Sequence, residues 1–168
     1  MPEHEDAGRS QAQDVVIGPG GKLTWAILRR FTDYVLAMEG GQVWIEGGVT
    51  EVERGLFAYP LTKVHREERR LSYAFRGTVR FVGHSGLLDL PFSDPILTFE
   101  GSTCILTIVD PDGGPRLVLA QGRTVTEPSD APIEVSLAPD GSEYFFSRYP
   151  VGMALEPLEV QVSAVPNP

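Results

Sequence analysis

The chain has 168 residues, of which 42% are hydrophobic and 22% are charged, as expected for one soluble globular domain. Its formal net charge is −9 and it has no sustained basic stretch, which excludes nucleic-acid binding and disfavours attachment to anionic membranes. No run approaches the roughly 20 apolar residues that are needed to span a bilayer, so we expect no membrane insertion.

The N-terminal region is polar and acidic. We expect residues 1–18 to form a flexible tail, followed by a single domain over residues 19–168. The segment from Met1 to Gln13 has neither a basic region nor an apolar core, so it does not resemble a secretory signal. With Met1 as the natural start, we therefore expect a cytoplasmic protein.

One segment near the N-terminus has a clear helical pattern. Thr24 is a suitable N-cap, and Gly40–Gly41 supplies a stop. Ile27, Phe31 and Tyr34 lie on the flank of an apolar stripe between these ends. The stripe itself has helical spacing and consists of Trp25, Leu28, Phe31, Val35 and Met38. The pattern predicts a helix that presents Tyr34 beside its apolar face.

The rest of the chain has the pattern of short strands joined by turns. Its 18 glycines and 14 prolines favour many short elements. The clearest strand is expected over Arg70–Val82, where apolar and polar residues alternate. The preceding run, His65–Arg70, has mixed charge and is expected to be a solvated turn. Further strands are expected over Val43–Glu46, Leu56–Leu61, Ile96–Glu100, Thr103–Val109, Arg116–Val125, Ile133–Leu137, Tyr144–Ser147 and Leu158–Val162.

These patterns together predict an all-β fold, mainly an antiparallel β-sandwich-like one, with one prominent N-terminal α-helix. Cys104 is the only cysteine and lies within an apolar strand, so we expect a small buried core residue. A single cysteine cannot form an internal disulfide.

Common catalytic and metal-binding motifs fail on their spacing. Gly83–Gly86 begins like a nucleophile elbow, but Leu87 replaces its second glycine. Asp110 begins like a calcium loop, but a glutamine stands where the closing acid belongs. The remaining candidates are Tyr34 on the helix flank and His84 in a glycine-flanked loop. Each has an ordinary explanation alone, as a packing tyrosine or a turn histidine.

Three motifs resemble those of the HtaA family of haem-binding domains. Gly21–Val35 contains Gly-Lys-Leu-Thr-Trp and then Phe-Thr-Asp-Tyr-Val, and it resembles the opening helix of the family. Gly77–Leu90 resembles its central signature, which Ser93–Pro95 continues, and Tyr149–Pro157 resembles its closing segment. The resemblance extends from about Gly18 to the C-terminus, and its combined motifs are specific.

The resemblance implies a non-covalently held haem b whose ferric iron is bound by Tyr34 as the axial ligand. His84 would hydrogen-bond the Tyr34 oxygen, and Tyr149 would lie against the porphyrin. The apolar walls of the porphyrin slot are expected to be Trp25, Ile27, Phe31, Met38 and Phe81. A free phenol has a pKa of about 10 and is a poor ligand at neutral pH, so a donor that stabilises the phenolate strengthens the bond. Tyrosinate is a known haem ligand, as in catalase.

Arg30 departs from the family pattern, in which a small hydroxyl residue often stands one turn before the ligand tyrosine. Residues four apart share a helix face, so Arg30 can reach Tyr34 or a haem propionate. The same spacing is found around the catalase ligand. Arg30 is therefore either a solvent-facing side chain or an added positive charge that changes the reactivity of the iron.

Two functions are compatible with these features. The first is a haem-binding protein that carries, stores or transfers haem inside the cell, with a haem donor or acceptor protein as its partner. The alternative is a haem-dependent enzyme that uses peroxide, or Lewis-acid chemistry in small-molecule biosynthesis, with Arg30 tuning Tyr34. A fold that has exchanged haem for another apolar ligand is disfavoured, because both Tyr34 and His84 are present. An exposed haem edge would also allow stacking across a homodimer.

Overall fold

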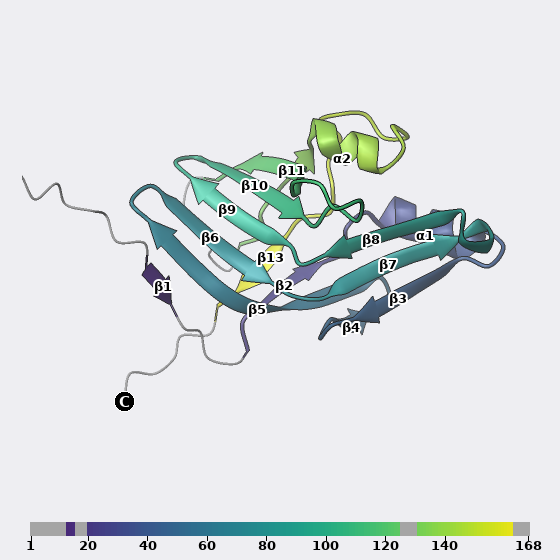
Figure 1. Cartoon of the computed structure of the whole chain (residues 1–168), viewed down its shortest axis with the longest axis horizontal. Helices are drawn as coiled ribbons and strands as arrows, with labels where there is room; N and C mark the ends of the chain where they lie inside the picture. The colour runs from purple at the N-terminus through teal and green to yellow at the C-terminus, as the bar shows by residue number, and fades with distance from the viewer. Residues whose placement is uncertain (1–12, 16–19, 125–130, 163–168) are drawn as a thin grey trace, which may run out of the picture.

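The computed structural model describes residues 13–15, 20–124 and 131–162. A large curled antiparallel sheet is joined to a small three-stranded sheet, and two helices lie toward one end of the molecule (Figure 1). The predicted fold class, mainly antiparallel β with one prominent N-terminal helix, is confirmed.

The large sheet contains β1 (Gln13–Val15), β2 (Lys22–Trp25), β4 (Thr50–Glu53), β5 (Leu56–Glu67), β6 (Arg70–Phe75), β9 (Ile96–Glu100), β10 (Thr103–Ile108), β11 (Leu117–Arg123), β12 (Ser136–Leu137) and β13 (Glu159–Gln161). Its order is β12-β11-β10-β9-β6-β5-β2-β13, and β1 and β4 also pair with β5. The small sheet contains β3 (Gln42–Glu46), β7 (Thr78–Gly83) and β8 (Leu88–Ser93), in the order β3-β7-β8. The helical elements are α1 (Arg29–Ala37), the 3₁₀ turn η1 (His84–Gly86) and α2 (Pro139–Tyr144).

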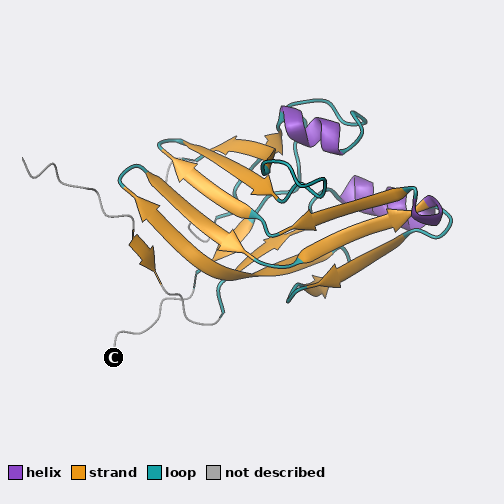
Figure 2. Cartoon of the chain, in the orientation of Figure 1, coloured by secondary structure: helices purple, strands orange, loops and turns teal. Residues whose placement is uncertain are grey.

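Residues 133–158 bring the two ends of the large sheet together. Ile133 and Leu158 exchange backbone hydrogen bonds of 2.7 and 2.9 Å, and the Leu155 N–H donates to the Val135 carbonyl at 3.0 Å. Because these segments lead into β12 and β13, which are the outer strands of the sheet order, the sheet curls around its core (Figure 2). The largest fully buried side chains of this core are Trp25, Tyr59, Phe57, Phe81, Phe92 and Phe145.

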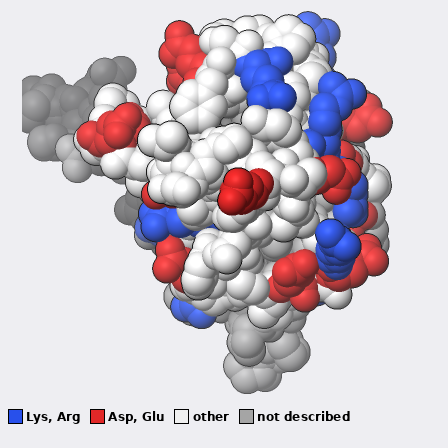
Figure 3. Space-filling view, turned by 90° about the vertical axis from the view of Figure 1, so that its right-hand side faces the viewer, with Lys and Arg blue, Asp and Glu red and all other residues white. Residues whose placement is uncertain are grey.

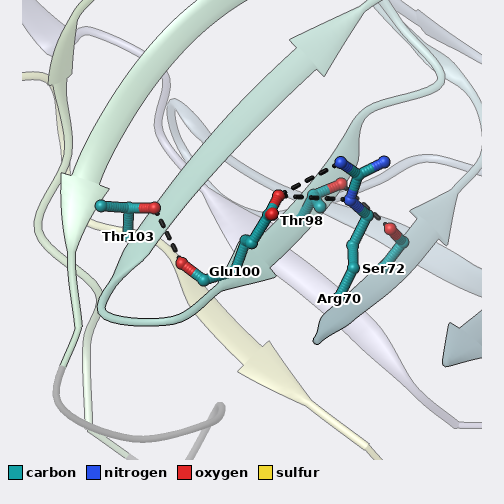
Figure 4. A network of polar contacts seen from close by, with 5 residues as sticks. All are labelled: Arg70, Ser72, Thr98, Glu100 and Thr103. Carbon is teal, nitrogen blue, oxygen red and sulfur yellow. Dashed lines mark hydrogen bonds and ion pairs between the residues drawn. The ribbon is translucent and has the colours of Figure 1, made fainter. Parts of the chain in front are cut away.

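The outward face of β6, β9 and β10 carries a polar network (Figure 4). Arg70 donates from Nε and Nη2 to Glu100 Oε2 at 3.3 and 3.2 Å. The Ser72 and Thr98 hydroxyls lie 3.1 Å apart, and Thr103 Oγ1 donates to the Glu100 carbonyl at 2.9 Å. Because both charged side chains are largely exposed, the ion pair contributes at most about 1 kcal/mol. The opposite face of these strands packs into the core, where Cys104 is buried as predicted.

The prediction of one continuous strand over Arg70–Val82 is wrong. This region forms β6 and β7, which belong to different sheets. Gly77 lies between them with a φ of +107°, a conformation that favours glycine. A Cβ at this position would lie 2.6 Å from Val49 Cγ2. The Gly77 N–H donates to Asp94 Oδ1 at 2.8 Å, so the chain is held as it bends from one sheet to the other.

The N-terminal helix is shorter than predicted, and Thr24 does not cap it. Thr24 and Trp25 belong to β2, and α1 begins only at Arg29, without a side-chain cap. The Trp25 ring is fully buried, and its Nε1 donates to the Glu156 carbonyl at 3.0 Å. Strand pairing and this distant contact therefore override the helical pattern in the first turn.

The prediction of a strand over Tyr144–Ser147 is also wrong, because α2 ends in this region. Pro139 at its start and Asp140 in its first turn suit a helix N-terminus. The predicted turn over His65–Arg70 is wrong in extent, since β5 continues to Glu67 and β6 begins at Arg70. The predicted strand over Ile96–Glu100 is confirmed as β9, and the other predicted strands are present with shifted ends, although the predicted end at Val125 lies outside the described residues. Strands β1, β2, β4 and β8 were not predicted.

Part of the predicted tail is an ordered strand. Asp14 of β1 pairs with His65 of β5, whereas residues 1–12 and 16–18 lie outside the described residues. Within the described ranges, no helix is long and apolar enough to cross a membrane.

Candidate functional site

Helix α1 presents Tyr34 at the edge of the core. Phe31 and Val35 of the same helix are buried, whereas Tyr34 is half-buried and packs against the core from its rim. The Phe31 ring lies 5.0 Å from the Phe81 ring, 5.1 Å from the Phe145 ring and 6.3 Å from the Tyr34 ring, between centroids. Phe31 therefore joins α1 to the small sheet and to the end of α2, and it fixes the position of Tyr34.

The loop that carries His84 lies beside the C-terminal end of α1. Met38, one turn after Tyr34, packs so closely on Gly83 that a Cβ on this glycine would lie 2.1 Å from Met38 Sδ. His84 follows directly in η1, so Tyr34 and His84 belong to adjoining segments at one end of the molecule (Figure 1). The His84 side chain is exposed, and among the described residues no hydrogen bond joins it to Tyr34.

Tyr149 is buried next to these segments. Its side chain is 5% exposed, and its ring lies 5.4 Å from the Phe145 ring. Burial raises the pKa of the Tyr149 hydroxyl above its ordinary value, the Arg148 and Arg30 cations oppose this rise, and the Tyr34 phenol adds to it. The two phenols and the two guanidinium groups thus interact electrostatically in one site.

Arg148 is the site residue that the sequence did not reveal. Its Cζ lies 3.9 Å from the centroid of the Tyr34 ring, which is the geometry of a cation–π contact. Helical spacing had suggested Arg30 as the cation beside Tyr34. Arg30 is exposed instead, and its positive charge acts on the Tyr149 hydroxyl. The only signal for Arg148 is its place directly before Tyr149 in the closing motif.

Two turns at the site hold non-glycine residues in the left-handed region. Phe146 and Ser147, which precede Arg148, have φ values of +58° and +55°. His84 and Ser85 in η1 have φ values of +49° and +57°. Each such residue costs about 1 kcal/mol or more, and strain of this kind persists where the surrounding structure fixes it and often marks functional sites.

The turn before Tyr149 is fixed by the buried Ser142. Ser142 Oγ donates to the Tyr149 carbonyl at 2.6 Å, and the Ser142 carbonyl accepts the Ser147 N–H at 2.8 Å. We expect Ser142→Ala to lower the free energy of unfolding by about 1–2 kcal/mol, because it removes the hydroxyl donor of the Tyr149 carbonyl. Ser147→Ala should change it by less than about 0.5 kcal/mol, because its hydroxyl is exposed. Denaturant unfolding would measure both, and equal effects would contradict this assignment.

The segments that carry Tyr34, His84 and Tyr149 also expose large apolar side chains. The exposed fraction is 38% for Leu36, 89% for Leu87, 67% for Phe146 and 54% for Val151. Figure 3 looks onto this end of the molecule, where uncharged atoms occupy most of the middle and most charged groups lie around them. Exposed apolar surface beside convergent polar groups is typical of a site for an apolar ligand.

A concavity of about 760 Å³ lies away from these segments, between β10, β11 and residues 134–136. Its lining includes Cys104, Gly122 and Glu134 but no residue of α1 or η1. It also contains neither a tyrosine nor a histidine. Within the described ranges, no group of three His, Cys, Asp or Glu side chains could hold a metal ion. The convergence of Tyr34, His84 and Tyr149 is therefore the better candidate.

Comparison with known proteins identifies the family. A sequence profile of the HtaA family, described as Htaa, matches residues 20–161. The chain belongs to the HtaA family. A search of curated protein sequences gives no significant match. The match covers the HtaA domain from the start of β2 to the end of β13, and thus includes every segment of the candidate site.

Solved structures share the fold of this HtaA domain. The N-terminal domain of HtaA from Corynebacterium glutamicum is 22% identical with a TM-score of 0.73, and the alignment covers 89% of this chain and 100% of that one. The haem-binding protein HtaB from the same organism is 21% identical with a TM-score of 0.66, covering 89% and 95%. The C-terminal domain of HtaA is 22% identical with a TM-score of 0.65, covering 84% and 96%.

The five residues expected as apolar walls pack in or against the core of this HtaA domain, and only Met38 among them is partly exposed. Ile27 has no exposed surface, and its carbonyl accepts the Glu156 N–H at 3.1 Å. Phe31 is 2% exposed and lies among the aromatic rings of the core. Ile27 and Phe31 are thus core residues without surface to offer as walls, and Phe31 supports Tyr34 from within the core.

Proposed function

We propose that this HtaA domain binds one haem b non-covalently and carries, stores or transfers it, with Tyr34 as the axial ligand of ferric iron. The observation that carries the proposal is the convergence of Tyr34, the His84 loop and Tyr149, which are far apart in the sequence, at one end of the molecule. The fold shared with a haem-binding protein, HtaB of Corynebacterium glutamicum, supports it.

The chemistry of the donor set suits haem. Among the described residues the hydroxyls of Tyr34 and Tyr149 have no hydrogen-bond partner, although both rings pack against the core. A phenolate oxygen is a suitable ligand for ferric iron, and haem would supply that iron together with two anionic propionates. Arg30, an exposed cation that acts on the same site, can pair with a propionate.

The proposal assigns different roles to the residues around the iron ligand. Tyr34 would donate its oxygen, and the exposed His84 imidazole would donate a hydrogen bond that stabilises the phenolate and orients its ring. Tyr149 would lie against the porphyrin, backed by Phe145 at an interplanar angle of 79°. The exposed Leu87 and Phe146 side chains would shield the porphyrin from water.

Titration of the purified domain with hemin tests the function. We expect binding of one hemin per chain and a ferric tyrosinate signature in absorbance and resonance Raman spectra. Absence of stoichiometric binding would refute the proposed function. Binding with the spectrum of a different axial ligand would refute the assignment of Tyr34.

His84 should support the ligand without replacing it. We expect His84→Ala to weaken hemin binding by roughly 10- to 100-fold while the tyrosinate spectrum persists, because only the supporting hydrogen bond is lost. His65→Ala is the matched control, since His65 lies on β5 and belongs to the large sheet. Hemin titrations of both variants would measure the effect, and an unchanged affinity for His84→Ala would contradict the role given to this imidazole.

A further inference from the structure

We propose that Arg148 is a positioning residue for the axial ligand: its guanidinium, stacked on the Tyr34 ring, holds that ring in place and makes the iron easier to reduce. The inference deepens the proposed function and rests on it, because it requires that Tyr34 binds ferric iron. It assigns to Arg148, and not to Arg30, the control of the redox equilibrium of the site.

The contact leaves the ligand atom available. Arg148 Cζ lies 3.9 Å from the Tyr34 ring centroid, well within the roughly 6 Å that defines a cation–π contact. A cation at this distance covers one face of the ring, whereas the oxygen projects from its edge. Among the described residues the Tyr34 oxygen has no hydrogen-bond partner, so the guanidinium can remain in place when this oxygen meets iron.

The backbone around Arg148 directs this side chain toward the Tyr34 ring. The Arg148 N–H donates to the Phe145 carbonyl at 3.1 Å, and the next residue, Tyr149, is anchored in the core. Phe146 and Ser147 adopt left-handed conformations directly before it. A strained turn between two buried aromatic residues thus places the guanidinium beside Tyr34. An arginine that moved freely on the surface would not need such a turn.

The charge of Arg148 is available to act on the iron site. Within the described part of the chain no carboxylate forms an ion pair with it. A positive charge beside the phenolate disfavours the ferric state, which carries one more positive charge than the ferrous state. Arg148 is exposed, so solvent reduces this effect without removing it. The anionic Tyr34 phenolate favours ferric iron, whereas the positive charge of Arg148 favours ferrous iron. A weaker reductant can therefore reduce the iron when Arg148 is present.

The test is the reduction midpoint of the haem-loaded domain, measured by spectroelectrochemistry. We expect Arg148→Gln to favour ferric over ferrous iron by about tenfold, which lowers the midpoint by about 59 mV for one electron. Arg148→Lys keeps the charge and should recover most of the shift. Arg30→Gln is the matched control for loss of one cation that acts on the same site without stacking on the Tyr34 ring, and it should shift the midpoint less.

A measurement without haem tests the stacking by itself. In the haem-free domain, the NMR signals of the Tyr34 ring should move in Arg148→Gln and stay in place in Arg30→Gln. An unchanged midpoint in Arg148→Gln, or an equal shift in Arg30→Gln, overturns the inference about the iron, and unchanged Tyr34 signals overturn the stacking. Failure of the proposed function is seen separately, as a parent domain without a ferric tyrosinate spectrum, and the inference about the iron fails with it.

Discussion

Tyr34→Phe should abolish the ferric tyrosinate spectrum and weaken hemin binding well beyond the roughly 100-fold that loss of a supporting partner can cause. The variant removes the oxygen that would bind iron and keeps the aromatic ring. That ring lies 6.3 Å from Phe31 and beneath the Arg148 guanidinium, so the packing of α1 is preserved. The free energy of unfolding should therefore stay within about 0.5 kcal/mol of the parent value.

The matched control is Tyr149→Phe, since Tyr149 is a second phenol in the same site. This variant keeps the ring that would lie against the porphyrin, and we expect the tyrosinate spectrum to persist. Hemin titration and resonance Raman spectroscopy distinguish the two variants. Retention of the spectrum in Tyr34→Phe together with its loss in Tyr149→Phe would transfer the role of ligand to Tyr149.

Gly41→Ala should be strongly destabilising, by about 3 kcal/mol or more, because there is no space for its methyl group. A Cβ on Gly41 would lie 1.6 Å from the Val35 carbonyl oxygen and 3.0 Å from Met38 Cγ. Both neighbours belong to the end of α1, and the Val35 carbonyl already accepts the Met38 N–H at 3.2 Å. The helix end must therefore move, and Tyr34 with it, so hemin affinity should fall as well.

Gly40→Ala is the control for this substitution. Gly40 has a φ of +70°, but no atom lies within 4 Å of a Cβ built on it. Its replacement should cost only the backbone strain of about 1–2 kcal/mol. Denaturant unfolding compares the two variants. If Gly40→Ala proved as destabilising as Gly41→Ala, the steric explanation would be wrong.

The fold class could be predicted from the sequence because alternation of apolar residues is a local property. The ends of individual helices and strands could not be predicted, because contacts with residues far away in the sequence determine them. Trp25 continues the helical pattern, yet it lies in a strand whose neighbours include β5 and whose indole donates to Glu156. The bend at Gly77 depends likewise on Asp94 and Val49, which lie in other parts of the chain.

Local motifs in the sequence could indicate individual residues of the candidate site, but not the contacts between them. Tyr34, His84 and Tyr149 each lie in a recognisable motif, and the structure brings their segments together. The contact between Arg148 and Tyr34 has no local pattern, since it joins α1 to the turn after α2. Helical spacing could suggest only Arg30, because that residue shares the helix of Tyr34.

The segment of residues 133–158 that draws the ends of the large sheet together has a consequence for how the protein is made. The phenol of Tyr34 comes from an early part of the chain, whereas its guanidinium partner and Tyr149 come from this late segment. A nascent chain still on the ribosome would lack half of the site until that segment had emerged and docked. Haem capture in the proposed site would thus have to wait until residues 133–158 have docked on the rest of the domain.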